Sequence, residues 1–360
     1  MNDPAQLTVL PAVQFKKRRQ PWWVSDLMEG ESITFIVDPG HGPARARLLF
    51  PATTIVSVCS PSRGCPYHEG RDWVWEGDCL VLPATSTIPF WTSQELTPPL
   101  HSQPYGLVRR DGTGDILFGA THEYHDRQIE VTYRHCNGLW QGPVPGFAGE
   151  ELPHLMRKLA SKTPITLAVF GDSISTGCNA SAWAKVAPFQ PGYPELVQRN
   201  LESAYSVAVT LRNLAVSGMT STWGLEQVAA VAATQPDLVI IAWGMNDGNA
   251  PGLPAAEFAN NIAAQMIAIQ AASPLVEFIL VAGMLPNDDW QTVVPGLLLR
   301  YRDAVLSLVR KGVVVADISG IWDELLKRKR HLDLTGNGVN HPNDFGHRLY
   351  ADVLNTLLIP

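Results

Sequence analysis

Four residues in the second half of the chain are of types that together carry out acyl transfer. Ser173, in FGDSIS, has a hydroxyl that attacks a carbonyl only when a neighbouring base takes its proton. His341, in NHPND, has an imidazole suited to take that proton and return it to a leaving group. Gly218, in NLAVSG, and Asn246, in GMND, offer N–H donors to a developing oxyanion. The residue types therefore predict nucleophilic catalysis by a serine.

Ser173, Gly218 and Asn246 each lie at the end of an apolar run with the pattern of a doubly covered strand. Amphipathic segments with helical periodicity alternate with these runs. The apolar runs are residues 165–173, 207–218, 237–247, 277–286 and 312–319, and the helical segments are 193–205, 224–235, 255–272, 296–311 and 343–358. This alternation predicts a three-layer α/β domain. Its active site should lie at the carboxyl ends of the strands, where the polar residues gather.

The four stretches resemble, in order and spacing, the four sequence blocks of SGNH hydrolases, also called the GDSL esterase/lipase family. The resemblance covers roughly residues 163–360. It implies a flavodoxin-like domain with a five-stranded parallel sheet, with Ser173 as nucleophile and His341 as general base. The oxyanion hole would consist of the Ser173 and Gly218 backbone N–H groups and the Asn246 side chain. The sequence lacks the GxSxG turn of α/β-hydrolases, which disfavours that fold.

One expected residue is missing. SGNH hydrolases commonly have an aspartate three residues before the histidine, where this chain has Gly338. Three groups remain open as the partner that orients His341: Asn337, a backbone carbonyl of the loop, or Asp333. We favour an amide-assisted site or a Ser–His dyad, in which no carboxylate stabilises the imidazolium. Asn343 or Asp344 is interpreted as the cap of the last helix, and Asp344 is expected to cap that helix rather than to orient His341.

The first part of the chain has a different pattern, with short alternating or β-branched segments between turn residues. These segments are residues 32–40, 44–60, 73–84, 114–125 and 128–135. They predict a smaller all-β domain, of sandwich or jelly-roll type, over residues 1–148. Residues 149–162 are interpreted as a linker, and residues 163–360 as the hydrolase domain.

Neither a metal nor a cofactor is expected. His122, His125 and His135 lie close in sequence, but the first two point to opposite faces of an alternating strand. Net charge is −7, and the one dense basic cluster, KRKRH at 327–331, is interpreted as a helix end. We therefore expect no nucleic-acid partner. Without an apolar span or signal core we expect a cytoplasmic protein that does not bind membranes, although secretion stays open.

The resemblance and the domain order together lead to an expected activity. A β domain joined to an SGNH domain resembles bimodular carbohydrate esterases, which implies a serine esterase that removes short acyl groups, mainly acetyl, from a small-molecule or carbohydrate ester. Two alternatives remain open: a lipase or thioesterase of the same family, and a carbohydrate-binding protein with a decayed hydrolase site. The oligomeric state is left undetermined.

Overall fold

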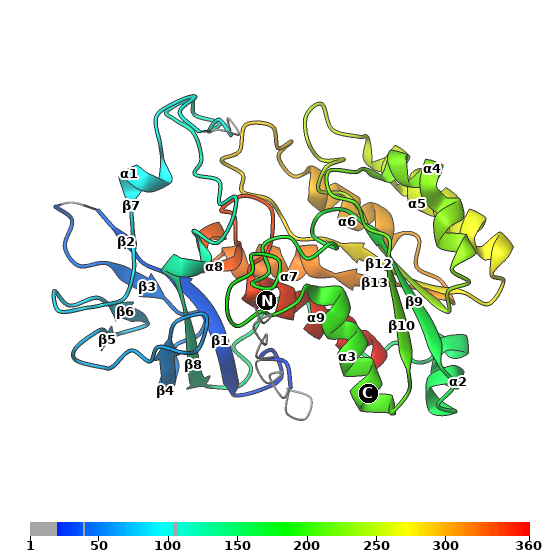
Figure 1. The fold of residues 1–360 in the computed structure, drawn as a ribbon, viewed down its shortest axis with the longest axis horizontal. Coiled ribbons are helices and arrows are strands. Elements are labelled where there is room, and N and C mark those ends of the chain that lie inside the picture. Colours follow the sequence, from blue (N-terminus) through cyan, green and yellow to red (C-terminus); the bar gives the residue numbers. More distant parts are fainter. Residues whose placement is uncertain (1–19, 39, 104–106) are drawn as a thin grey trace, which may run out of the picture.

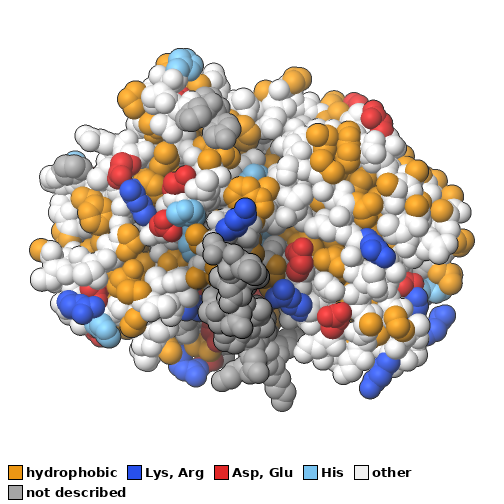
Figure 2. Space-filling model, in the orientation of Figure 1, with side chains coloured by type: hydrophobic (Ala, Val, Ile, Leu, Met, Phe, Trp, Pro, Cys, Tyr) orange, Lys and Arg blue, Asp and Glu red, His pale blue; other side chains and the backbone are white. Residues whose placement is uncertain are grey.

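The computed structural model describes residues 20–38, 40–103 and 107–360. A β-rich domain lies on the left of the ribbon view and an α/β domain on the right (Figure 1). The expectation about a signal segment, and the first 19 residues of the predicted β domain, lie outside the described residues. On the face in Figure 2, acidic and basic side chains are interspersed.

The α/β domain is built on a five-stranded parallel sheet, as predicted. The strands are β9 (Ile165–Gly171), β10 (Val209–Asn213), β11 (Leu238–Ala242), β12 (Glu277–Ala282) and β13 (Val313–Asp317). They pair in the order β10-β9-β11-β12-β13. Most of their aliphatic side chains are buried, because helices cover both faces of the sheet.

Helices α4, α5 and α6 cover one face, and α3 and α9 cover the other (Figure 1). The predicted helices are α3 (Tyr193–Tyr205), α4 (Ser221–Ala233), α5 (Ala255–Ala272), α6 (Leu297–Leu306) and α9 (Asp344–Leu358). The sequence analysis did not identify α7 (Ile318–Leu326) or the short α8 (His331–Leu334). The basic stretch 327–331 directly follows α7, in agreement with its interpretation as a helix end.

The segment expected to be a linker contains a packed helix, α2 (Pro153–Ala160). Leu155 and Leu159 are buried, and the His154 and Leu155 N–H groups donate to the Glu277 carboxylate of β12. The Gly- and Pro-rich residues before it were interpreted as part of a linker. The structure instead shows a helix whose first N–H groups bind a carboxylate. A negative charge at this end is favoured because the helix dipole is positive there.

The smaller domain contains two three-stranded antiparallel sheets, as expected for a β domain. One consists of β1 (Leu27–Thr34), β8 (Gln128–His135) and β4 (Ala52–Cys59), with β8 central, and the other of β3 (Arg45–Arg47), β6 (Cys79–Val81) and β5 (Val74–Glu76). A parallel pair, β2 (Ile36–Val37) and β7 (Trp91–Thr92), leads into α1 (Ser93–Leu96). A 3₁₀ turn, η1 (His125–Arg127), precedes β8.

Residues 114–125 are not the predicted strand. The segment leaves the sheets and reaches the α/β domain, where the Gly119 N–H donates to the Asn337 carbonyl at 3.1 Å. Its alternating pattern was misleading because its backbone pairs with irregular segments rather than along a strand: the Asp115 and Ile116 N–H groups donate to the Pro98 and Leu107 carbonyls, whereas Gly119 bonds to the other domain. This contact places a piece of the N-terminal domain beside the His341 loop.

A buried ion pair joins the two domains. Lys329 Nζ lies 2.5 Å from Glu31 Oε1, and their side chains are 1% and 0% exposed. Glu31 also accepts from Tyr133 Oη at 2.5 Å. Because Lys329 neutralises a carboxylate that has no access to water, the pair is costly to break on one side only.

Lys329→Met is therefore expected to lower the free energy of unfolding by about 3–5 kcal/mol, because it leaves the Glu31 charge uncompensated. Urea denaturation monitored by circular dichroism measures this change. Lys327→Met is the matched control, because Lys327 is 61% exposed in its pair with Glu324. That substitution should change stability by less than about 1 kcal/mol. Equal losses in the two variants would contradict the role of the buried pair.

Candidate active site

Three of the predicted residues follow three adjacent strands of the sheet. Ser173 comes just after β9, Gly218 after β10 and Asn246 after β11. The chain moves from β9 to β10 on one side and then to β11 on the other, so β9 marks the point where the strand order reverses. Crevices at such points are the usual ligand sites of open α/β sheets. The topology therefore brings the three residues to one edge.

Ser173 lies on a tight turn at the end of β9. Its carbonyl accepts from Thr176 Oγ1 at 2.8 Å and from the Cys178 N–H at 3.1 Å. At Gly171, just before the turn, an added Cβ would lie 2.6 Å from the Ala242 carbonyl oxygen of β11. Glycine thus allows β9 to end close against its neighbour.

The structure brings Ser173 and His341 into direct contact, with Ser173 Oγ 2.8 Å from His341 Nε2. Burial, with a smaller contribution from His347, lowers the pKa of His341 to about 4. The imidazole is therefore neutral at neutral pH and free to accept a proton. The contact has the geometry of an activated nucleophile and its base.

Asn179, which the sequence analysis did not identify, is the group that contacts the other side of the imidazole. Its Oδ1 lies 2.8 Å from His341 Nδ1. Asn179 Nδ2 donates to the carbonyls of Gly336 at 3.2 Å and Gly119 at 3.4 Å. These two acceptors fix the amide orientation, so the oxygen faces the imidazole. Nδ1 must then carry the hydrogen, which leaves Nε2 to accept from Ser173.

The partners of His341 that were considered from the sequence have other roles. Asn337 Oδ1 accepts from the backbone N–H groups of Val339, Asn340 and His341 at 2.9, 3.0 and 3.1 Å. It shapes the loop and holds the backbone of His341, not its ring. The Asp333 carboxylate accepts from the Thr34 N–H at 2.8 Å and pairs with Arg330. A backbone carbonyl is also excluded, because the Asn179 side chain occupies that position at Nδ1.

Asp344 and His347 support the loop that carries Asn179. Of the two cap candidates, Asn343 caps α9, while Asp344 Oδ1 accepts from the Ser181 N–H at 2.8 Å and does not cap the helix. His347 Nε2 lies 3.2 Å from the Cys178 carbonyl oxygen, and burial lowers its pKa to about 4. Side chains of α9 thus hold the loop on both sides of Asn179, at Cys178 and at Ser181.

Gly218 and Asn246 each keep an N–H group available as a hydrogen-bond donor. Gly218 has φ +81°, which favours glycine, and nothing lies within 4 Å of the space that a Cβ would occupy. Within the described part of the chain, the Ser173 and Gly218 N–H groups donate to no other residue. Asn246 Nδ2 donates one hydrogen to the Met219 carbonyl at 2.8 Å and has a second to offer.

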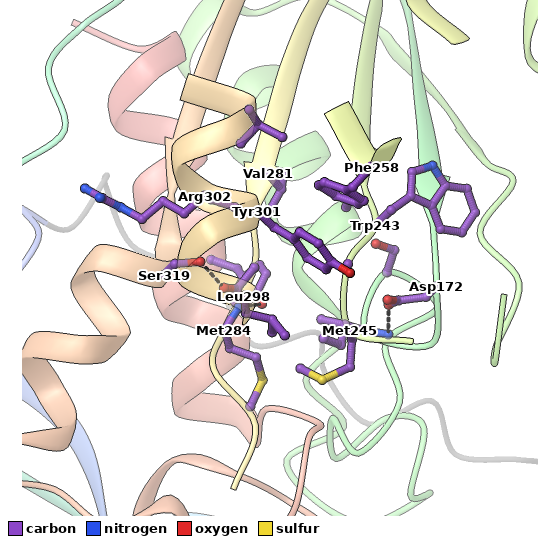
Figure 3. Close-up of a pocket in the computed structure, with 18 residues that line it drawn as sticks. Asp172, Trp243, Met245, Phe258, Val281, Met284, Leu298, Tyr301, Arg302 and Ser319 are labelled. Carbon is purple, nitrogen blue, oxygen red and sulfur yellow. Dashed lines mark hydrogen bonds between the residues drawn. The ribbon is translucent and has the colours of Figure 1, made fainter. Parts of the chain in front are cut away.

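A small cavity of about 30 Å³ lies behind the nucleophile turn. Asp172, Met245, Met284 and Tyr301 are among the side chains around it (Figure 3). Asp172 Oδ1 accepts from the Ile174 N–H at 3.0 Å, and burial raises the pKa of Asp172 to about 7. A cavity of this volume has room for one or two water molecules.

The described residues contain no group of three or more His, Cys, Asp or Glu side chains arranged to hold a metal. His122 pairs with Asp126, His125 contacts the Ala187 carbonyl, and His135 stacks on Phe50. In the same part of the chain, no helix combines the length and hydrophobicity that crossing a bilayer requires.

The model of the GDSL-like lipase/acylhydrolase family matches residues 169–349. This chain belongs to that family. The match confirms the resemblance drawn from the four sequence blocks. No curated protein sequence matches significantly.

Solved structures of esterases are similar to this chain at low identity. A two-domain esterase active on acetylated mannans, co-crystallised with mannopentaose, has 21% identity and TM-score 0.46 over 59% of this chain and 54% of its own. An acetylxylan esterase from Geobacillus stearothermophilus has 21% identity and TM-score 0.45, over 53% of this chain and 92% of its own. The chain thus spans about half of the first structure's length.

The low pKa of His341 leads to a prediction about pH dependence. A protonated imidazole cannot accept the Ser173 proton, so activity should be lost only as pH falls through about 4 rather than through the ordinary value of 6.5. Initial rates of p-nitrophenyl acetate hydrolysis across the acid and neutral range give the profile of kcat/KM. Circular dichroism at each pH separates this effect from acid unfolding. A half-maximal rate near the ordinary histidine value would contradict the role of burial.

Proposed function

We propose that this protein is a serine esterase that hydrolyses short-chain esters, foremost acetyl esters, through an acyl-enzyme on Ser173. The observation that carries the proposal is the 2.8 Å contact between Ser173 Oγ and His341 Nε2 at the carboxyl edge of the sheet. The membership of the GDSL-like lipase/acylhydrolase family supports the same reaction class.

The proposed reaction uses groups that the chain itself supplies. Ser173 Oγ attacks the ester carbonyl carbon while His341 Nε2 takes its proton. The tetrahedral oxyanion accepts hydrogen bonds from the N–H groups of Ser173 and Gly218 and from Asn246. His341 then gives the proton to the departing alkoxide, and an alcohol leaves. Water repeats the sequence on the acyl-enzyme, which releases the acid and restores Ser173.

In the proposed mechanism a neutral amide, that of Asn179, orients the general base. Its carbonyl accepts from His341 Nδ1 and keeps the ring in one orientation and one tautomer throughout the reaction. It is a neutral dipole, so it stabilises imidazolium less than a carboxylate would.

A short acyl group is proposed because the sequence has no long apolar segment that could form a lid over an acyl chain. A carbohydrate as the alcohol component is proposed from the domain order, a β domain preceding the hydrolase domain, with segment 114–125 reaching the catalytic loop.

A chain-length series of p-nitrophenyl esters, together with acetylated xylo- and manno-oligosaccharides, tests the proposal. The value of kcat/KM for the acetate should exceed that for the octanoate by at least about tenfold. A preference for the octanoate would favour the lipase or thioesterase alternative. Absence of turnover with every ester would favour the decayed, carbohydrate-binding alternative and overturn the proposal.

A further inference from the structure

The described residues include a segment of the N-terminal domain that touches both loops of the catalytic pair. The Gly119 carbonyl accepts from Asn179 Nδ2 at 3.4 Å, and the Gly119 N–H donates to the Asn337 carbonyl at 3.1 Å. Asn179 lies on the loop after the nucleophile, and Asn337 lies on the loop that presents His341. A single glycine of the β domain therefore bridges the two loops.

Contacts on either side of Gly119 hold the bridge in place. Tyr124 is fully buried, and its hydroxyl donates to the Leu117 carbonyl at 2.8 Å. His125 Nε2 lies 2.8 Å from the Ala187 carbonyl oxygen, further along the Asn179 loop. Residues 117–125, which we call the brace segment, are thus tied together by the Tyr124–Leu117 hydrogen bond and held against the α/β domain at Gly119 and His125.

The bridge requires a residue without a side chain. A Cβ on Gly119 would lie 2.6 Å from Tyr124 Cδ2 and 3.0 Å from the Gly336 carbonyl oxygen. Gly336 is similarly confined, because its Cβ would lie 2.7 Å from Asn179 Cβ. The two carbonyls that accept from the Asn179 amide therefore reach it only because both residues are glycines.

We infer that the brace segment of the N-terminal domain positions the general base, with Gly119 acting through Asn179 to hold His341 in its Nδ1–H tautomer. An amide can rotate to exchange its oxygen and nitrogen, and the second orientation would present N–H groups to His341 Nδ1. The Gly119 and Gly336 carbonyls select the productive orientation because each accepts a hydrogen that the amide oxygen lacks. The β domain is then part of the active site as well as a neighbour of it. This inference rests on the proposed function.

The test is a double-mutant cycle with Gly119→Ala and Asn179→Ala. Gly119→Ala should lower kcat for p-nitrophenyl acetate by about 10- to 100-fold with a smaller change in KM. In the Asn179→Ala background the same change should have almost no further effect, because Gly119 acts through that amide. Additive losses would overturn the inference. Gly64→Ala is the matched control, because its Cβ would meet only Ser62 Oγ at 3.5 Å.

A spectroscopic readout separates this inference from the proposed function. In ¹⁵N NMR, the His341 signals, assigned from their loss in His341→Gln, should show a protonated Nδ1 and an unprotonated Nε2. Gly119→Ala should give a mixture of tautomers, whereas an unchanged single tautomer would overturn the inference. If no variant hydrolyses any ester and the tautomer still shifts, only the proposed function fails. Should Gly119→Ala not fold, Tyr124→Phe removes the bond to Leu117 without added bulk and should shift the tautomers in the same direction.

Discussion

Replacing Ser173 by alanine is expected to lower kcat for an aryl acetate by about 10⁴- to 10⁶-fold, because no other group then forms the acyl-enzyme. His341→Ala should lower kcat by a similar factor, since the hydroxyl is a weak nucleophile without its base. The double variant should be no slower than either single variant, because the two residues act as one unit.

The control for this prediction is Ser203→Ala, an exposed serine near the end of α3, beside the amino end of β10 and so at the opposite edge of the sheet from Ser173. It should leave kcat unchanged. Steady-state kinetics with protein freed of other esterases give both values. If Ser173→Ala kept a tenth or more of the parent rate, roughly within 1.4 kcal/mol of it, a different nucleophile would have to be responsible.

Asn179→Ala is the second large effect that we expect. It removes the acceptor for His341 Nδ1–H, so the ring can turn or adopt the other tautomer. The loss in kcat should be about 10²- to 10⁴-fold, the range reached when a catalytic histidine is held in the wrong tautomer. KM should change little, because Asn179 contacts the base and not the substrate position.

Asn179→Asp is a sharper form of the same prediction. A carboxylate would restore an acceptor for His341, but its second oxygen would face the Gly119 and Gly336 carbonyl oxygens, now 3.4 and 3.2 Å from the amide nitrogen. We expect a loss of activity rather than a gain, and a shift of the acidic limb of the pH profile to higher pH. A rate above that of the parent would show that the carbonyls do not enforce an amide.

The four catalytic blocks could be predicted from the sequence because their signals are local. Ser173, Gly218 and Asn246 follow apolar strand patterns, and His341 precedes a predicted helix. Parallel strands bring such positions to one edge of a sheet, so the arrangement follows from the element order. The assignment of catalytic roles to these four residues stays a prediction until the variants are measured.

The residue that orients the His341 ring could not be predicted in the same way. Asn179 is 162 positions from His341, and it lies in an irregular loop with no periodic pattern. The sequence around His341 contains Asn337 and Asp333 as polar candidates. In the structure, Asn337 shapes the loop and Asp333 forms an ion pair with Arg330. A polar side chain six residues after the nucleophile was the only available signal.

The contribution of the β domain was hidden for a related reason. Residues 114–125 alternate like a strand, but their backbone hydrogen bonds go to irregular segments of the same domain and, at Gly119, to the Asn337 carbonyl of the other domain. The choice between these partners depends on tertiary contacts that a short sequence window does not contain. The same holds for α2, whose start is fixed by Glu277 more than a hundred residues later.

The most direct test of the account is covalent labelling with a fluorophosphonate, located by tandem mass spectrometry. This reagent reacts with a serine hydroxyl only when a base activates it. The account predicts one adduct, on Ser173, which forms much more slowly in Asn179→Ala and not at all in His341→Ala. An unlabelled Ser173 in a chain that hydrolyses esters, or an adduct on a different serine, would contradict it.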